Sequence, residues 1–82
     1  MIKVYGMPSC PDCATVLEQI AGREDEFDFI DIGAHVRNMK AFMRIRDNEA
    51  IFDACKERGS IGIPAFILED GRISLDPKDA GL

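Results

Sequence analysis

The sequence predicts a single α/β domain built on a four-stranded mixed sheet flanked by helices, and three observations lead to this fold class. The chain has 82 residues, which suffice for one small domain because ~100–200 residues per domain is usual. Segments with the apolar spacing of a helix alternate with short segments rich in β-branched and aromatic residues. Two strand-like segments near the end are joined by Asp-Gly, a hairpin signal. We therefore expect one domain over residues 1–82, with the element order β-α-β-α-(α)-β-β.

The first half of the chain predicts a strand, a helix and a second strand. Ile2–Tyr5 alternates apolar and polar residues and is rich in β-formers, so we expect a strand there. A loop with Gly, Ser and two Pro follows, and apolar residues then recur at three- and four-residue spacing from Pro11 to Ala21, which predicts an amphipathic helix. Pro11 suits the first turn of that helix, where its missing N–H is not needed. Aromatic and β-branched residues predict a second strand at residues 27–32.

The second half predicts an extended middle helical region followed by a hairpin. Two apolar stripes within residues 35–58 lose phase around Asp47-Asn48, both good N-cap residues. We expect two helices, or one strongly kinked helix, ending at Gly59. Ala65–Leu68 is wholly apolar, which predicts a central strand, and an edge strand at residues 73–75 follows the Asp-Gly turn. Only a short C-terminus remains beyond that strand.

Composition and charge exclude several classes of protein. Ten basic residues against fifteen acidic ones give a net charge of -5. A nucleic-acid binder is therefore not expected, because such proteins neutralise phosphates with Lys and Arg. No apolar run approaches the ~20 residues of a membrane helix, and the first residues do not form a secretory signal. Three cysteines, two of them close together, indicate local chemistry in a reducing compartment rather than a disulfide scaffold. We expect a cytoplasmic protein whose partners are neither nucleic acid nor membrane.

The segment Cys10-Pro11-Asp12-Cys13 carries the most chemical information. A C-x-x-C between a strand and a helix places the first sulfur at the helix N-terminus, where unpaired N–H groups and partial positive charge stabilise a thiolate. Asp12 opposes this thiolate by like-charge repulsion. The second sulfur lies in the first helical turn, less exposed and able to attack a mixed disulfide formed on the first. The spacing predicts that Cys10 attacks and Cys13 resolves.

A second motif, Ile61-Gly62-Ile63-Pro64, precedes the third predicted strand. Pro64 cannot donate a ladder hydrogen bond, so it must begin the strand or occupy a turn. Together with the C-x-x-C, this motif resembles the thioredoxin fold and specifically its glutaredoxin branch, over residues 2–76; Arg46-Asp47-Asn48 adds a resemblance to small bacterial glutaredoxin-related proteins. The resemblance implies that Pro64 is a cis proline beside the cysteines. It also implies that the backbone of Ile63 pairs with an extended peptide or with glutathione.

The sequence departs from the glutaredoxin pattern where that family holds glutathione. Met7-Pro8 occupies the region of the usual Lys, Asp12 replaces an aromatic residue, and Ser74-Leu75 stands where Gly-Gly is usual. The resemblance leaves Asp76 as the candidate for the family's glutathione-binding Asp. Pro11, inside the C-x-x-C, is a further candidate for contact with the substrate.

The leading functional hypothesis is a thiol-disulfide oxidoreductase that reduces protein disulfides or glutathione mixed disulfides. No bound cofactor is expected, and glutathione or a reductase protein would restore the dithiol. One alternative is a non-enzymatic thioredoxin-fold module that senses redox state. Another is metal or iron–sulfur binding through the C-x-x-C, for which only Cys55 and His35 remain as further ligands, whereas zinc takes four. We expect no metal site.

The other candidate residues have simpler interpretations. Cys55 falls on an apolar helical stripe, which predicts a core position. His35 lies near an expected helix start and is interpreted as a surface or capping residue. Four basic residues of the same helix are interpreted as a solvated face rather than a docking patch, namely Arg37, Lys40, Arg44 and Arg46.

Overall fold

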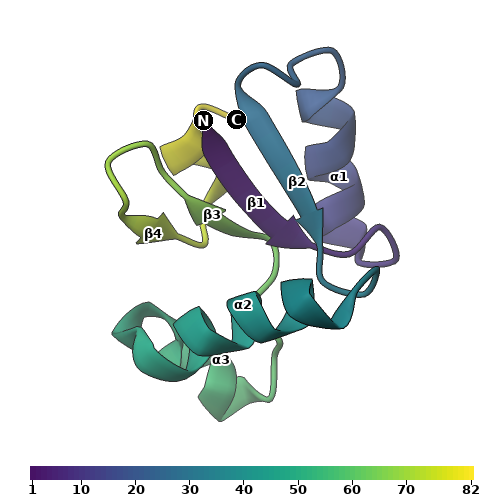
Figure 1. Ribbon diagram of the computed structural model, residues 1–82. Helices are drawn as coiled ribbons and strands as arrows, with labels where there is room; N and C mark the ends of the chain where they lie inside the picture. The colour runs from purple at the N-terminus through teal and green to yellow at the C-terminus, as the bar shows by residue number, and fades with distance from the viewer.

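Four strands form one mixed sheet in the order β2-β1-β3-β4 in the computed structural model, which describes residues 1–82 (Figure 1). The strands are β1 (Ile2–Gly6), β2 (Phe27–Asp31), β3 (Ala65–Ile67) and β4 (Ile73–Ser74). β1 is parallel to β2 and antiparallel to β3, and β3 and β4 form an antiparallel hairpin. The predicted parallel crossover, terminal hairpin, central β3 and edge β4 are thus confirmed.

The helices α1 (Pro11–Ile20), α2 (Val36–Asn48) and α3 (Asp53–Arg58) follow the expected order. Two 3-10 turns that the sequence did not predict, η1 (Ala50–Phe52) and η2 (Pro77–Ala80), complete the chain. The middle region is therefore two helices, and Gly59 ends the second with a left-handed φ of 74°. No helix is long and apolar enough to cross a lipid bilayer.

The break between α2 and α3 lies slightly later than the sequence predicts. Neither Asp47 nor Asn48 starts a new helix, because α2 continues through both. The Asn48 side chain donates its amide N–H to the Arg44 carbonyl at 2.7 Å, and the Glu49 N–H donates to the Ile45 carbonyl at 2.9 Å. Both bonds use carbonyls of the last turn, so α2 ends at Asn48 with partners for its terminal groups.

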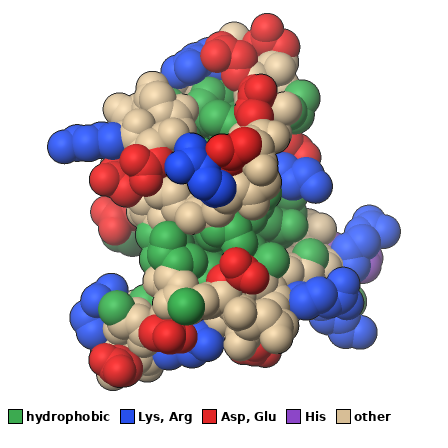
Figure 2. All heavy atoms as spheres, turned by 90° about the vertical axis from the view of Figure 1, so that its left-hand side faces the viewer, with side chains coloured by type: hydrophobic (Ala, Val, Ile, Leu, Met, Phe, Trp, Pro, Cys, Tyr) green, Lys and Arg blue, Asp and Glu red, His purple; other side chains and the backbone are tan.

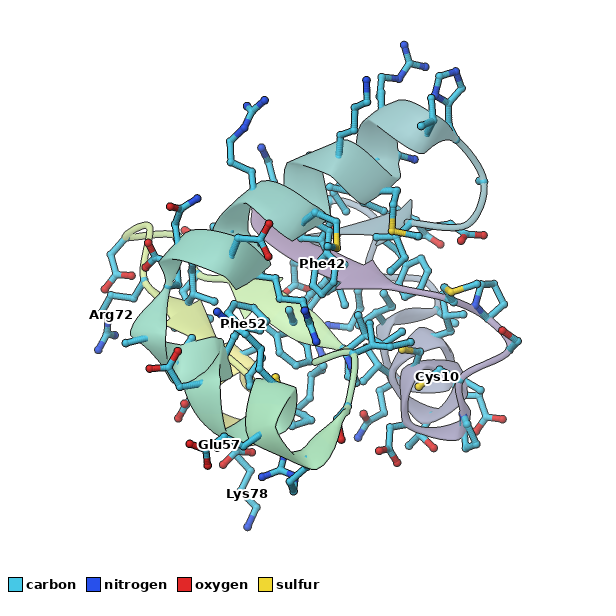
Figure 3. All side chains as sticks on the ribbon, turned by 90° about the horizontal axis from the view of Figure 1, so that it is seen from below. Cys10, Phe42, Phe52, Glu57, Arg72 and Lys78 are labelled. Atoms are coloured by element: carbon cyan, nitrogen blue, oxygen red, sulfur yellow. The ribbon has the colours of Figure 1, made fainter.

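Strand side chains alternate between two cores, one on each face of the sheet. The first core packs α1 and η2 against the sheet and contains Val4, Val16, Ile20, Phe27, Phe66 and Ala80. The second packs α2, η1 and α3 against the other face and contains Tyr5, Ile32, Phe42, Phe52, Cys55 and Ala65. Phe42 and Phe52 meet edge to face with ring centroids 5.9 Å apart, between the helices and the sheet (Figure 3).

Charged side chains surround an apolar strip on the face of the molecule that carries β4. Figure 2 shows hydrophobic side chains in a band across this face, with Lys, Arg, Asp and Glu side chains above and below it. The band lies at the level where the sheet meets the layer of α2 and α3. It marks the boundary between the two layers.

The sheet brings two loops to the same edge. β1 ends at Gly6, immediately before the loop that leads to Cys10, and β3 begins at Ala65, immediately after Pro64. Tyr5 and Ala65 are partners in the antiparallel ladder, so the ends of both loops lie side by side. This register places both sequence motifs at one end of the central strand pair.

Candidate dithiol site

Cys10 occupies the N-cap of α1, with extended backbone angles of φ -82° and ψ 124°. Its N–H donates to the Met7 carbonyl at 3.0 Å, and its carbonyl accepts the first helical hydrogen bond, from Ala14 N–H at 2.9 Å. The Cys10 side chain makes no capping hydrogen bond and is partly exposed. Pro11 occupies the first helical position, as expected. The Cys10 thiol therefore lies at the positive end of α1 and within reach of solvent (Figure 3).

Cys13 is fully buried, with 0% of its surface exposed. Its sulfur packs on the end of β1, where a Cβ added to Gly6 would lie 2.8 Å from Sγ. Burial raises the pKa of the Cys13 thiol from 9.0 to about 12, and a hydrogen bond from the Met7 N–H to the sulfur acts in the opposite direction. A hydrogen bond to the Cys10 side chain and the negative charges of Cys10 and Asp12 raise this pKa further. Cys13 is thus a protonated thiol at neutral pH.

The loop before β3 offers an open stretch of backbone. The Ile63–Pro64 peptide bond is cis, as the sequence resemblance implies, and Pro64 is buried. Gly62 has a φ of +96°, and a Cβ there would lie 2.8 Å from the Phe52 ring, so this position requires glycine. The N–H and carbonyl of Ile63 make no hydrogen bond within the chain. Ile63 therefore presents one free donor and one free acceptor beside the end of β1.

Arg46 holds this loop against α2, a role that the sequence interpretation missed. Its Nε donates to the Ile61 carbonyl at 2.7 Å, and its Nη2 donates to the Ser60 carbonyl at 2.8 Å. The interpretation of Arg46 as part of a solvated face is therefore wrong. The residues that it joins lie 14 and 15 positions away in the chain, so no local pattern signals the contact.

A pocket of about 480 Å³ lies between α1, α3, the loop before β3 and the link from β4 to η2. Its lining consists of Asp12, Thr15, Val16, Gln19, Cys55, Arg58, Ser60, Gly62, Ile63, Pro64, Leu75 and Pro77. Of the predicted site residues, Ile63 and Pro64 line it. Neither Cys10 nor Cys13 lines the pocket, but Asp12, which lies between them in the chain, does line it.

Besides the two cysteines, two further predicted site residues lie outside this pocket. Pro11 is exposed at the start of α1. Asp76 is exposed and caps η2, where its Oδ1 accepts the Lys78 N–H at 3.0 Å. Leu75 and Pro77, on either side of Asp76, reach the pocket instead. The sequence could not indicate which of these three consecutive residues faces it.

The remaining cysteine and the histidine lie apart from the dithiol. Cys55 is 2% exposed in the second core, as predicted, and its thiol donates to the Phe52 carbonyl at 3.0 Å. His35 caps α2, and its Nδ1 accepts the Arg37 N–H at 3.0 Å. No group of three or more His, Cys, Asp or Glu side chains is arranged to hold a metal ion. The structure therefore does not gather Cys55 and His35 around the C-x-x-C.

The chain is similar to a protein of Haemophilus influenzae that is described only as uncharacterized. The two are 37% identical over 68 residues, which make up 83% of this chain and 79% of that protein. The chain belongs to the same family as this protein. The relationship covers most of both chains and thus concerns the domain as a whole. No family model matches the chain, and no solved structure does.

Proposed function

We propose that this protein is a thiol-disulfide oxidoreductase with a glutaredoxin-like thioredoxin fold, in which Cys10 and Cys13 are the reacting groups. The observation that carries the proposal is the asymmetry of the two thiols. One lies partly exposed at a helix N-terminus, and the other is fully buried and protonated at neutral pH. A dithiol that attacks with one sulfur and resolves with the other needs this difference.

The fold assignment within this proposal is supported by the sheet. A helix follows the first strand and begins at the C-x-x-C, the first two strands are parallel, and the last two form an antiparallel hairpin. Pro64 immediately precedes the strand that pairs with β1. These features are what the thioredoxin-fold resemblance of the sequence implies.

The reaction proceeds in two exchange steps. The Cys10 thiolate attacks one sulfur of the substrate disulfide, the substrate S–S bond breaks, and the departing sulfur takes up a proton. Cys13 then loses its proton and attacks the Cys10 sulfur of the mixed disulfide, which releases the second substrate sulfur as a thiol. The substrate gains two electrons and two protons, and the protein is left with a Cys10–Cys13 disulfide. Glutathione or a reductase protein supplies the two electrons that restore the dithiol.

The order of these steps agrees with the electrostatics of Cys13. Negative charge on Cys10 contributes to the raised pKa of the Cys13 thiol. That contribution disappears once Cys10 is bound in a mixed disulfide, so Cys13 becomes easier to deprotonate at the step that needs its thiolate. The free N–H and carbonyl of Ile63 support a substrate segment that adds to the chain as an extended strand.

The test is turnover of a protein disulfide and of a glutathione mixed disulfide, with glutathione or a thioredoxin reductase system as the electron source. We expect Cys10→Ser to abolish both activities. We expect Cys13→Ser to abolish reduction through the dithiol and to accumulate a mixed disulfide on Cys10, detectable by mass spectrometry. Circular dichroism of each variant shows that the fold is retained.

A different result would contradict the proposal. If the reduced protein accelerates neither reaction, or if Cys10→Ser retains the wild-type rate, it is not an oxidoreductase of this kind. A protein that forms the Cys10–Cys13 disulfide once but shows no turnover would instead match the redox-sensor alternative.

A further inference from the structure

The pocket next to the dithiol carries two formal charges of opposite sign. Asp12 lies in the first turn of α1, and Arg58 is the last residue of α3. The other ten lining residues carry no formal charge. A ligand in this pocket therefore meets one anion and one cation on walls that come from different helices.

Neither charge is satisfied within the chain. The four ion pairs of the protein involve other residues, so Asp12 and Arg58 are not paired with each other or with any other side chain. Their side chains also make none of the hydrogen bonds of the structure, whereas Arg46, the other arginine near this loop, uses its guanidinium for two. Both groups are therefore available to a ligand.

The size and position of the pocket suit a short stretch of peptide. Its volume of about 480 Å³ falls within the ~300–1,000 Å³ of ordinary ligand sites. Ile63, with its unpaired backbone groups, lines the pocket. Asp12 lies between the two cysteines in the chain. A segment that adds along Ile63 while its half-cystine reaches Cys10 would carry its neighbouring side chains past both charged walls.

We propose that this pocket selects peptide disulfides by the charge next to their half-cystine, with a carboxylate bound by Arg58 and a cation bound by Asp12. The preferred substrate is thus a peptide with oppositely charged residues on the two sides of the cysteine. The inference rests on the proposed function, because it assigns a substrate class to the same dithiol. Arg58 and Asp12 act as specificity-determining residues.

The test uses mixed disulfides between one chromogenic aromatic thiol and N-acetylated, C-amidated tripeptides. The sequences are Glu-Cys-Lys, Lys-Cys-Glu and Ala-Cys-Ala, and the glutathione mixed disulfide represents a free small molecule with both charges. Each rate is divided by the rate with dithiothreitol, a neutral reductant, which removes differences in the intrinsic reactivity of the substrates. The readout is the ratio of rates between substrates, because a change at Asp12 also alters the reactivity of Cys10 toward all of them.

We expect one of the two charged tripeptides to react about three- to tenfold faster than Ala-Cys-Ala, since two ion pairs to the exposed Asp12 and Arg58 side chains supply factors of this order. The ratio of the two rates should fall toward one in about 1 M salt, where such ion pairs are screened. Asp12→Asn and Arg58→Gln should each reduce it, and the double charge reversal Asp12→Lys with Arg58→Glu should favour the opposite tripeptide. A glutathione mixed disulfide faster than every tripeptide would assign the same charge recognition to the small molecule.

Two outcomes overturn the inference in distinguishable ways. Wild-type rates that agree within about twofold for all substrates, or a preference that persists in Asp12→Asn and Arg58→Gln, overturn the charge recognition alone. Absence of turnover with every substrate overturns the proposed function and this inference with it.

Discussion

At the scale of single residues, Gly6 and Cys13 define the position of the buried thiol. The sulfur occupies space that any larger residue at position 6 would fill, since an added Cβ would lie 2.8 Å from Sγ and 3.1 Å from the Phe29 ring. The buried thiol is thus held by contacts from β1 and β2.

The variant Gly6→Ala tests this contact. The added methyl group displaces the Cys13 sulfur, so we expect slower formation of the Cys10–Cys13 disulfide by a thiol oxidant and a loss of about 1–3 kcal/mol in the free energy of unfolding. Free thiols counted over time and urea denaturation measure the two effects. Alkylation of the partly exposed Cys10 is the control, since the methyl group does not meet its sulfur. Disulfide formation at the wild-type rate would show that Gly6 does not determine the position of Cys13.

Single residues also mark where sequence reasoning succeeds and where it stops. The N-cap position of Cys10 and the burial of Cys13 were predictable because the geometry of the C-x-x-C is local, whereas the cis peptide bond of Pro64 was implied only by the family resemblance. Arg46 and Arg58 were not predictable, since their positions depend on how α2 and α3 pack against a distant loop. Contacts between segments far apart in the chain leave no pattern in one sequence.

At the scale of elements, the loop before β3 is held from two sides. Gly62 lets the backbone approach the Phe52 ring, and Arg46 of α2 binds the Ser60 and Ile61 carbonyls. Because these bonds use a charged donor, each contributes more than an ordinary hydrogen bond. α2 therefore determines the position of the Ile63 backbone without contacting it through this side chain.

We expect Arg46→Gln to lower the free energy of unfolding by about 1.5–3 kcal/mol, the usual contribution of hydrogen bonds to a charged group. The loop should also become more susceptible to limited proteolysis. Arg44→Gln is the matched control, because Arg44 is exposed on the same helix and should change stability by less than about 0.5 kcal/mol. Equal effects of the two substitutions would show that the Arg46 bonds do not hold the loop.

The order and type of the elements could be predicted from periodicity, because each strand and helix has its own apolar pattern. The ends were less certain. α2 continues through Asp47 and Asn48, since the Asn48 side chain bonds back to Arg44 rather than capping a new helix. A residue whose side chain can cap the start of one helix can also bind the last carbonyls of the preceding helix. Which of the two it does depends on where α3 packs.

At the scale of the whole molecule, the sheet separates two cores. The dithiol lies at the N-terminus of α1, the helix that packs in the first core. Val16 and Ile20 of α1 are core residues, and Cys13 of the same helix is buried next to β1. The protonation of the Cys13 thiol is therefore linked to the free energy of unfolding of the whole domain.

The free energy of unfolding should decrease as the pH rises through the alkaline range. Burial raises the pKa of Cys13 to about 12 in the folded protein, whereas the unfolded thiol titrates near 9.0. Between these values the unfolded chain has released a proton that the folded chain keeps, so higher pH favours unfolding. Below the unfolded value the contribution is fully present. Urea denaturation at a series of pH values from about 8 to 10.5 measures the effect.

Cys13→Ser is the control for this titration, because its hydroxyl does not ionise in the same range. The variant should be less stable at every pH but should lose stability more slowly with rising pH than the wild type. Parallel curves for the two proteins would contradict the raised pKa of Cys13.

Because α1 begins at one sulfur, buries the other and ends in the core, the proposed Cys10–Cys13 disulfide formation and folding form one thermodynamic cycle. Any gap in unfolding free energy between the oxidised and reduced proteins must equal the amount by which the native chain shifts the intrinsic tendency of these two sulfurs to bond. Substitutions deep in the first core that act unequally on the two redox forms will therefore retune the midpoint potential without touching a sulfur atom.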